Sequence, residues 1–210
     1  MEEIKTKGEI KMRCNFSKGN WSMDGLMHAY SSRFTQDKQF VQREDCIENP
    51  TDPNMRDGYG YISLITDKKM KPGVRLTTHC AFYGLAAPLV VIVKDLFEKN
   101  GLPSYGDYQE VVLWKNGMNV WNLWMKEDGN VEYHKLAGIR ASLEEEKIHE
   151  LIVDVLEDGF EITMDGQKLY VRDEHIYPEF YLGITGCEGL CKFYDMEISE
   201  ICKKISSQQD

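Results

Sequence analysis

The chain has 210 residues, of which 42% are hydrophobic and 29% are charged, and its net charge is -10. This length and composition are typical of a soluble protein with one large core, so we expect a single domain over residues 1–210. The acidic balance argues against nucleic acid and anionic membranes as partners, and no apolar run approaches the length of a membrane span.

The N-terminal residues include no apolar segment of the secretory type, which favours a cytoplasmic location. In that setting we expect the cysteines to be free thiols; they are Cys14, Cys46, Cys80, Cys187, Cys191 and Cys202. The Cys187-x-x-x-Cys191 pair has neither the spacing nor the second pair of a zinc site. We therefore predict no metal centre and no cofactor.

The first quarter of the chain is polar and rich in turns. Residues 1–20 alternate weakly and predict an early edge strand or arm, residues 21–30 a loop, and residues 33–46 one or two strands. Residues 49–58 are rich in proline, glycine, Asp and Asn, which indicates turns. Their Asp and Asn oxygens also leave a calcium site open as an alternative, although the twelve-residue calcium-loop pattern is absent.

Alternating and apolar runs follow. Residues 59–66 and 74–83 predict strands, and the apolar run 87–94 predicts a strand at the centre of a sheet. Residues 95–100 suggest one helical turn, and residues 100–106 a loop.

Residues 107–137 predict three strands joined by two tight turns. Asn116-Gly117 and Asp128-Gly129 tolerate the positive φ angles of two-residue hairpin loops. Such loops fix the register, and directly paired residues share a face. One predicted face carries Tyr108, Glu110, Val112, Trp114, Asn119, Trp121, Leu123, Met125, Glu132, His134 and Leu136. The other face is more apolar, includes Trp124 and is expected to face the core.

The last third of the chain predicts mostly short strands. Residues 142–149 suggest a brief helix with a capping box, and His149 and His175 are expected to be solvated. Strands are predicted at 150–156, 160–164, 168–171, 180–185 and 191–201, followed by a frayed tail at 203–210. Many short strands with Gly and Asx turns indicate an all-β antiparallel β-sandwich, jelly roll or barrel with little helix.

Three sequence runs resemble the concanavalin A-like lectin/glucanase superfamily. They are Tyr108-x-Glu110 with Gly117-x-Asn119 and nearby indoles, the hairpin region 151–166, and the run from Phe180 to Ile198 with its Phe-Tyr-Asp segment. The nearest likeness is to YesU-like bacterial proteins of plant-polysaccharide utilisation. This resemblance implies a jelly roll of two curved sheets with a ligand groove on the concave one.

The candidate site chemistry is that of carbohydrate. The indoles of Trp114 and Trp121 offer flat faces for a sugar ring, while Asn119 and Glu110 offer polar groups for its hydroxyls, with Tyr108 beside them. The partner we expect is an oligosaccharide or polysaccharide fragment from a plant or host glycan. In the other interpretation, the indoles belong to the core.

Hydrolysis of the glycan is the alternative to simple binding. The Glu-x-Asp-x-Glu run that the resemblance would imply is absent, which leaves Glu110 with Glu132 or His134 as acid and base. These polar groups are equally consistent with a solvated sheet face. A structural or protein-binding sandwich is the third hypothesis.

Overall fold

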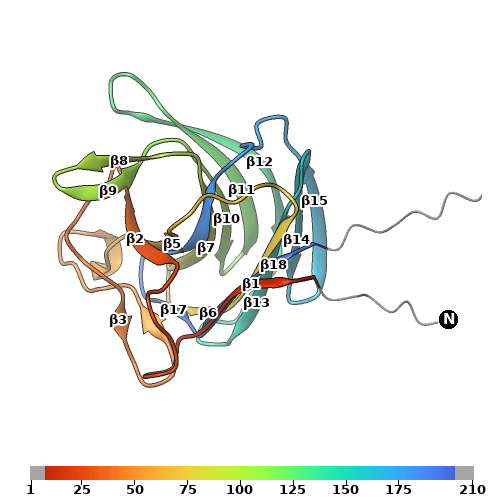
Figure 1. Ribbon diagram of the computed structural model, residues 1–210. Helices are drawn as coiled ribbons and strands as arrows, with labels where there is room; N and C mark the ends of the chain where they lie inside the picture. The colour runs from red at the N-terminus through yellow and green to blue at the C-terminus, as the bar shows by residue number, and fades with distance from the viewer. Residues whose placement is uncertain (1–7, 202–210) are drawn as a thin grey trace, which may run out of the picture.

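A computed structural model of the protein describes residues 8–201, and within that range it is built almost entirely from β-strands in two sheets (Figure 1). The back sheet has the order β15 (Gln167–Arg172), β14 (Gly159–Met164), β13 (His149–Val155), β6 (Val74–Phe82), β17 (Cys191–Phe193), β4 (Ile47–Glu48) and β3 (Val41–Gln42). In the same sheet, β18 (Asp195–Glu200) pairs with β6 and with β1 (Ile10–Asn15).

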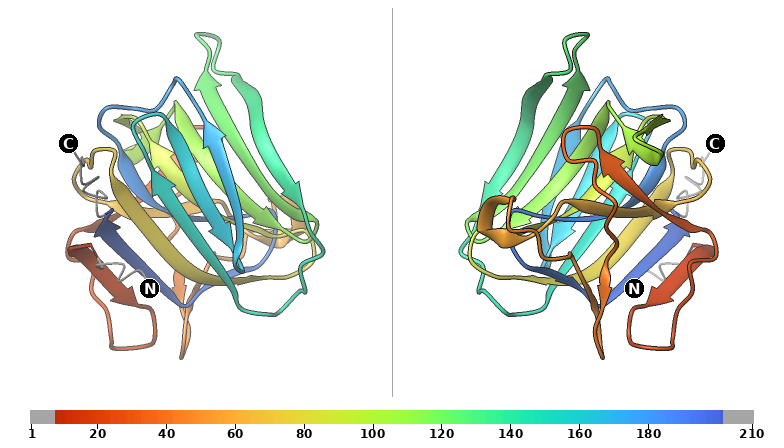
Figure 2. Two further views of the ribbon diagram at one scale, coloured as in Figure 1. Left: turned by 90° about the vertical axis from the view of Figure 1, so that its right-hand side faces the viewer. Right: turned by 90° about the vertical axis from the view of Figure 1, so that its left-hand side faces the viewer.

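The front sheet has the order β12 (Val131–Arg140), β11 (Gly117–Met125), β10 (Tyr108–Trp114), β7 (Ala87–Val93), β16 (Tyr181–Cys187), β5 (Ile62–Thr66), β2 (Leu26–Ser31), β9 (Leu102–Tyr105) and β8 (Leu96–Lys99). All pairings are antiparallel except that of β2 with β9. One 3-10 turn, Arg56–Gly58, lies in the Asx-rich loop. The left view of Figure 2 looks onto β14 and β15 of the back sheet.

The main core lies between the sheets. Alternate residues of each strand reach it, such as Val111 and Leu113 from β10 and Val153 and Leu151 from β13. Strand β7 is buried along its whole length because its other face is also covered, by a second apolar cluster. This explains why residues 87–93 form an apolar run instead of alternating with polar residues.

Most of the predicted strands are confirmed. The edge strand near Met12, the strands before and after Pro72-Gly73, the central strand β7 and the hairpins from residue 149 onward all occur close to their expected bounds. The Asp165-Gly166 turn has positive φ at both residues, as a two-residue hairpin loop of this kind requires. The predicted frayed tail at 203–210 lies outside the described residues.

The predicted elements of three regions are wrong. Residues 95–106 form the β8–β9 hairpin around Asn100-Gly101, where both residues have positive φ, instead of a helical turn and a loop. Residues 142–148 form no helix, because the Glu145 carboxylate accepts a hydrogen bond from the Gly84 amide at 2.9 Å instead of capping a helix. Residues 26–31 form strand β2 instead of a loop.

Region 33–46 contributes only β3, with two residues. Its remaining residues run as a loop, part of which lies over the front sheet. Within residues 8–201 there is no helix long and apolar enough to cross a membrane.

Candidate functional site

One face of the front sheet points away from the main core, and the sheet curves around this face (Figure 1). We call it the concave face. Paired residues point to the same side of a sheet, so side chains reach this face in rows. From the strands at one end of the sheet these are Glu110, Val112 and Trp114 of β10, Asn119, Trp121 and Leu123 of β11, and Tyr133 and Lys135 of β12.

The turn between β10 and β11 lies one position earlier than predicted. Trp114 pairs with Gly117, so Lys115-Asn116 is the two-residue loop. This moves each partner by two positions, and an even shift leaves every side chain on its predicted face. Glu110 now pairs directly with Trp121. The predicted grouping of the glutamate with the two indoles is therefore confirmed, although the individual pairs differ.

The turn between β11 and β12 changes the face of the residues that follow it. The loop contains the five residues Lys126–Asn130, closed by a hydrogen bond from the Lys126 amide to the Asn130 carbonyl at 2.8 Å. A two-residue loop at Asp128-Gly129 was predicted, and the register differs by one residue. The prediction that Glu132 and His134 share a face with Glu110 is therefore wrong.

Glu132 and His134 point to the other side of the front sheet, opposite the concave face. Glu132 pairs with Trp124 and His134 pairs with Asn122. The His134 Nε2 and Glu132 Oε1 atoms are 2.8 Å apart, and the His134 and Trp124 ring centroids are 4.4 Å apart. Trp124 also lies against His175, so this side holds an aromatic cluster of its own.

A β-bulge in β12 changes which of its residues point to the concave face. Trp121 pairs with Lys135, but the preceding residue of β11 pairs with Ala137, so Leu136 has no partner. Because one residue is skipped, Lys135 before the bulge and Arg140 after it point to the same side. The concave face thus gains two cationic side chains from one strand.

The other part of the concave face is covered by the chain itself. The Tyr105 hydroxyl of β9 bonds to Ser63 Oγ at 2.8 Å, and Ser63 Oγ bonds to the Thr185 hydroxyl at 2.7 Å. Tyr108, predicted as a sugar contact, is buried with its ring 5.0 Å from that of Tyr105. Tyr108 therefore lies beneath the surface of the concave face and is not accessible to solvent.

The loop after β2 supplies a wall beside the open part. The Arg33 guanidinium lies 4.9 Å from the centroid of the Phe34 ring and 5.3 Å from that of the Tyr133 ring. Phe34 stacks on Tyr61 with centroids 4.2 Å apart, and Trp121 meets Tyr133 edge-on at 6.4 Å. Aromatic side chains from three separate segments therefore lie next to one another on the concave face, and we call the surface formed by Arg33, Phe34, Tyr61, Trp121 and Tyr133 the groove.

Glu110 is a partly buried residue of the concave face and pairs with Trp121. Desolvation and the negative charge of Glu188 raise the pKa of Glu110 from about 4.5 to about 8, while Arg33 acts in the opposite direction. Burial, with the acidic neighbours Glu188 and Glu110, also raises the pKa of Tyr61. Near neutral pH, Glu110 is therefore mainly protonated and can donate a hydrogen bond.

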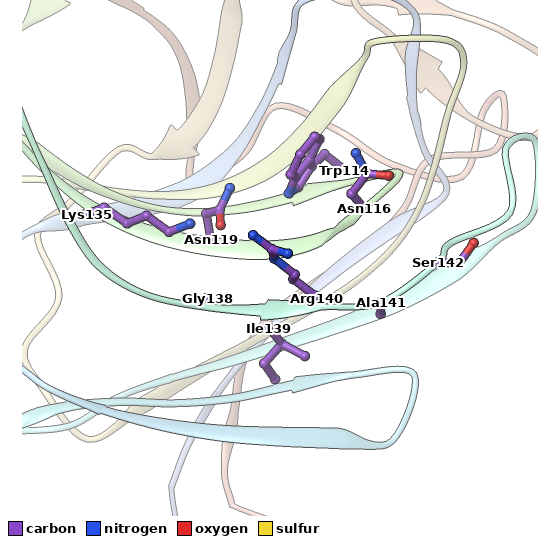
Figure 3. A pocket seen from close by; sticks show the side chains of 9 residues that line it. All are labelled: Trp114, Asn116, Asn119, Lys135, Gly138, Ile139, Arg140, Ala141 and Ser142. Atoms are coloured by element: carbon purple, nitrogen blue, oxygen red, sulfur yellow. The ribbon is translucent and has the colours of Figure 1, made fainter.

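A cavity of about 650 Å³ opens at the Trp114 end of the concave face (Figure 3). The residues that line it are Trp114, Asn116, Asn119, Lys135, Gly138, Ile139, Arg140, Ala141 and Ser142. Trp114 Nε1 is buried and has no hydrogen-bond partner, which is unusual for an indole N–H. The cavity is of a size that small ligands use.

The Asx-rich loop and the described cysteines show no metal site. Asp52 of the Asx-rich loop forms an ion pair with Lys38 at 3.0 Å and accepts a hydrogen bond from the Asn54 amide. Within residues 8–201 no group of three or more His, Cys, Asp or Glu side chains is arranged to hold a metal ion. Five cysteines are buried free thiols, and burial raises the pKa of Cys191 to about 12; Cys202 lies outside the described residues.

His149 and His175 differ in burial. His149 is buried, contrary to its predicted solvation, because its ring bonds to Asp165 at 2.6 Å and to the Glu144 carbonyl at 2.9 Å. His175 is exposed, as predicted.

The sequence did not identify several residues of the groove. Arg33, Phe34 and Tyr61 come from a loop and a strand end far from the β10–β12 region, and only the folded chain brings them there. Lys135 was placed on the core face by the one-residue register error at the β11–β12 loop, and Arg140 lies beyond the predicted strand region, which ended at residue 137. Tyr133 was placed on the core face by the same one-residue error that misplaced His134.

In sequence, the chain matches no family profile and no curated protein. In structure it is similar to β-agarase A from Zobellia galactanivorans, with a TM-score of 0.66, 10% identity, and 91% of this chain and 92% of that chain covered. It is also similar to the Ca²⁺/Man3GlcNAc-bound exoplasmic/lumenal domain of VIP36, with a TM-score of 0.64, 12% identity and coverage of 95% and 93%.

A third similar structure is the carbohydrate binding module CBM66 from Bacillus subtilis. Its TM-score is 0.60 at 9% identity, and 84% of this chain and 96% of that chain are covered. The chain shares its fold with these structures of an agarase, a lumenal domain and a carbohydrate binding module. It is an antiparallel jelly-roll sandwich, as predicted. The narrower resemblance to YesU-like proteins stays a prediction.

Proposed function

We propose that the concave face binds an oligosaccharide or a fragment of a polysaccharide. The observation that carries the proposal is the row of Trp114, Asn119, Trp121 and Glu110 on one open face. An indole stacks on the C–H face of a pyranose, while an amide and a carboxyl group bond its hydroxyls. The aromatic wall around Tyr61 extends the same surface.

The fold gives independent support. The similar structures include a carbohydrate binding module, a lumenal domain bound to Man3GlcNAc and an agarase. At 9–12% identity these likenesses carry the fold and not the ligand, so the sugar must be identified by experiment.

A glycoside hydrolase is the second candidate, and the raised pKa of Glu110 favours it. A carboxyl group that is protonated near neutral pH is suited to donate a proton to a leaving oxygen. The partner carboxylate would be Glu188, whose charge acts on Glu110. A pairing of Glu110 with Glu132 or His134 is not proposed, because these groups lie on the other side of the sheet.

A glycan array with three proteins tests binding. The wild type should bind a defined set of glycans, and Trp121→Ala should lose them. Tyr170→Ala removes an exposed ring from β15 of the back sheet and should bind as the wild type does. If Trp121→Ala binds as well as the wild type, the concave face is not the binding site.

Glu110→Gln separates binding from catalysis. A binding protein keeps most of its affinity after this change, because the amide still donates a hydrogen bond, whereas a hydrolase loses turnover of its oligosaccharide. If no glycan binds and none is cleaved, a structural or protein-binding role is favoured.

A further inference from the structure

We infer that the cavity beside Trp114 receives an anionic substituent of the glycan, either a sulfate ester or a carboxylate. This inference rests on the proposed function and names the class of its ligand. The cavity is continuous with the groove, since Lys135 lines it and also lies 5.7 Å from the centroid of the Trp121 ring. A sugar ring on Trp121 would extend its substituents toward this space.

The charge of the cavity lining favours an anionic ligand. Its lining includes the cations Lys135 and Arg140 and no Asp or Glu. The protein as a whole carries a net charge of -10, so a cavity with this lining stands out from the rest of the chain. Two cations in a concave site attract an anion more strongly than the same charges on a flat surface.

The two cations of the cavity, Lys135 and Arg140, have no carboxylate counter-charges among the described residues. Ion pairs involve most of the described Lys and Arg side chains, including Arg75 with Asp154 at 2.6 Å. Among residues 8–201, neither Lys135 nor Arg140 lies within ion-pair distance of a carboxylate. Figure 3 shows both cationic groups directed toward Asn119. A guanidinium binds sulfate and carboxylate groups through paired N–H donors.

Neutral donors around the cavity point to the same chemistry. Trp114 Nε1 is a buried N–H without a partner, and leaving such a donor unpaired costs about 1–3 kcal/mol. The Asn119 amide and the Ser142 hydroxyl add donors to the lining. A ligand oxygen with several lone pairs would satisfy them, whereas an apolar ligand would not.

Gly138 of β12 lies between the two cations and allows the neighbouring groups to pack closely. A Cβ at this position would lie 2.7 Å from Asn119 Oδ1, 2.8 Å from the Met118 carbonyl oxygen and 3.3 Å from the Lys135 side chain, so only glycine lets Asn119 and Lys135 take these positions. The β-bulge before it is what brings two cations five residues apart onto one face. Gly138 and the bulge together place Lys135, Arg140 and Asn119 around the cavity.

The test compares charged and neutral forms of the same glycan by calorimetric titration. The probes are a sulfated galactan oligosaccharide, its desulfated counterpart, a galacturonan oligosaccharide and its methyl ester. We expect at least one anionic probe to bind about tenfold or more tightly than its neutral counterpart. The pair that shows the difference identifies sulfate or carboxylate as the recognised group.

Two arginine variants locate the effect. Arg140→Gln should reduce the affinity for the anionic probe by roughly ten- to a hundredfold and leave the neutral probe unchanged. Arg172→Gln makes the same charge change on the exposed edge strand β15 and should change neither affinity.

The outcomes separate the two proposals. If the neutral probes bind as tightly as the anionic ones and Arg140→Gln alters neither, the anionic inference is wrong while glycan binding stands. If no probe binds, or if Trp121→Ala has no effect on any of them, the proposed function fails as well.

Discussion

Glu110 makes the stability of the fold depend on pH in a way that can be measured. Its pKa in the folded protein is raised to about 8, against about 4.5 for an ordinary glutamate. Between these two values the folded protein holds a proton that the unfolded chain has released. The folded state then binds more protons than the unfolded state, so the free energy of unfolding falls as the pH rises through this window.

The size of the effect follows from the two pKa values. One proton of difference corresponds to about 1.4 kcal/mol per pH unit. Between about pH 5.5 and 7.5, where the folded carboxyl group begins to ionise, the loss amounts to about 2.5 kcal/mol. Such a loss is a large fraction of the stability of a typical domain.

Urea unfolding at these two pH values measures the effect. Glu110→Gln removes the titrating group, so the difference in unfolding free energy between wild type and variant should change by about 2.5 kcal/mol from the lower pH to the higher. Glu127→Gln, in the exposed β11–β12 loop, serves as the control and should show little change. The reasoning is refuted if Glu110→Gln and Glu127→Gln behave alike.

Three further predictions concern single side chains. Trp114→Phe removes the unpartnered N–H, so urea unfolding should show no loss of stability, while titration should show glycan affinity reduced about fivefold. Gly117→Ala should cost at least about 2 kcal/mol, because its Cβ would lie 2.0 Å from a carbonyl oxygen, whereas Gly129→Ala meets open space and should cost about 1 kcal/mol. Asp173→Ala removes the carboxylate that accepts hydrogen bonds from the buried amides of Gln109 and Asn122, of which only Gln109 keeps a second acceptor, and should cost about 2–3 kcal/mol in the same assay. Equal costs at the two glycines, or no cost at Asp173, would contradict the contacts described.

The strand pattern could be predicted because it depends on local residue chemistry. Alternation and Asx-Gly turns located most strands from β5 onward, and the apolar run of β7 indicated its central place. The same chemistry was present at Asn100-Gly101, where both residues have positive φ, but the flanking strands have only four residues each. So short a hairpin gives little alternation to detect.

It was harder to predict which side chains share a face, because a register shift of one residue exchanges the two faces of a strand and a shift of two does not. Gly117 looked like a turn residue, yet its absence of a side chain serves the close approach of β12. Asp128 caps the backbone amide of Asn130 at 2.9 Å and so supports a five-residue loop. One residue more or less in the register moves a whole strand to the other face, and Glu132 and His134 moved with it.

The groove itself could be predicted only in part. Trp114, Asn119, Trp121 and Glu110 lie on neighbouring strands joined by a short turn, so local register was sufficient to group them. Arg33 reaches Tyr133 across the width of the front sheet, and no spacing in the sequence encodes that approach. Tyr105, which covers Tyr108, is itself held by a hydrogen bond to Ser63 of a strand 42 residues earlier, and no pattern in the sequence encodes that contact.

The position of a bound sugar tests the central claim most directly. A crystal structure of the protein with the tightest glycan from the array should place a pyranose ring against Trp121, with a hydroxyl at Glu110 and its substituent directed toward Arg140. A sugar bound to the back sheet, or to loops away from the concave face, would contradict the account.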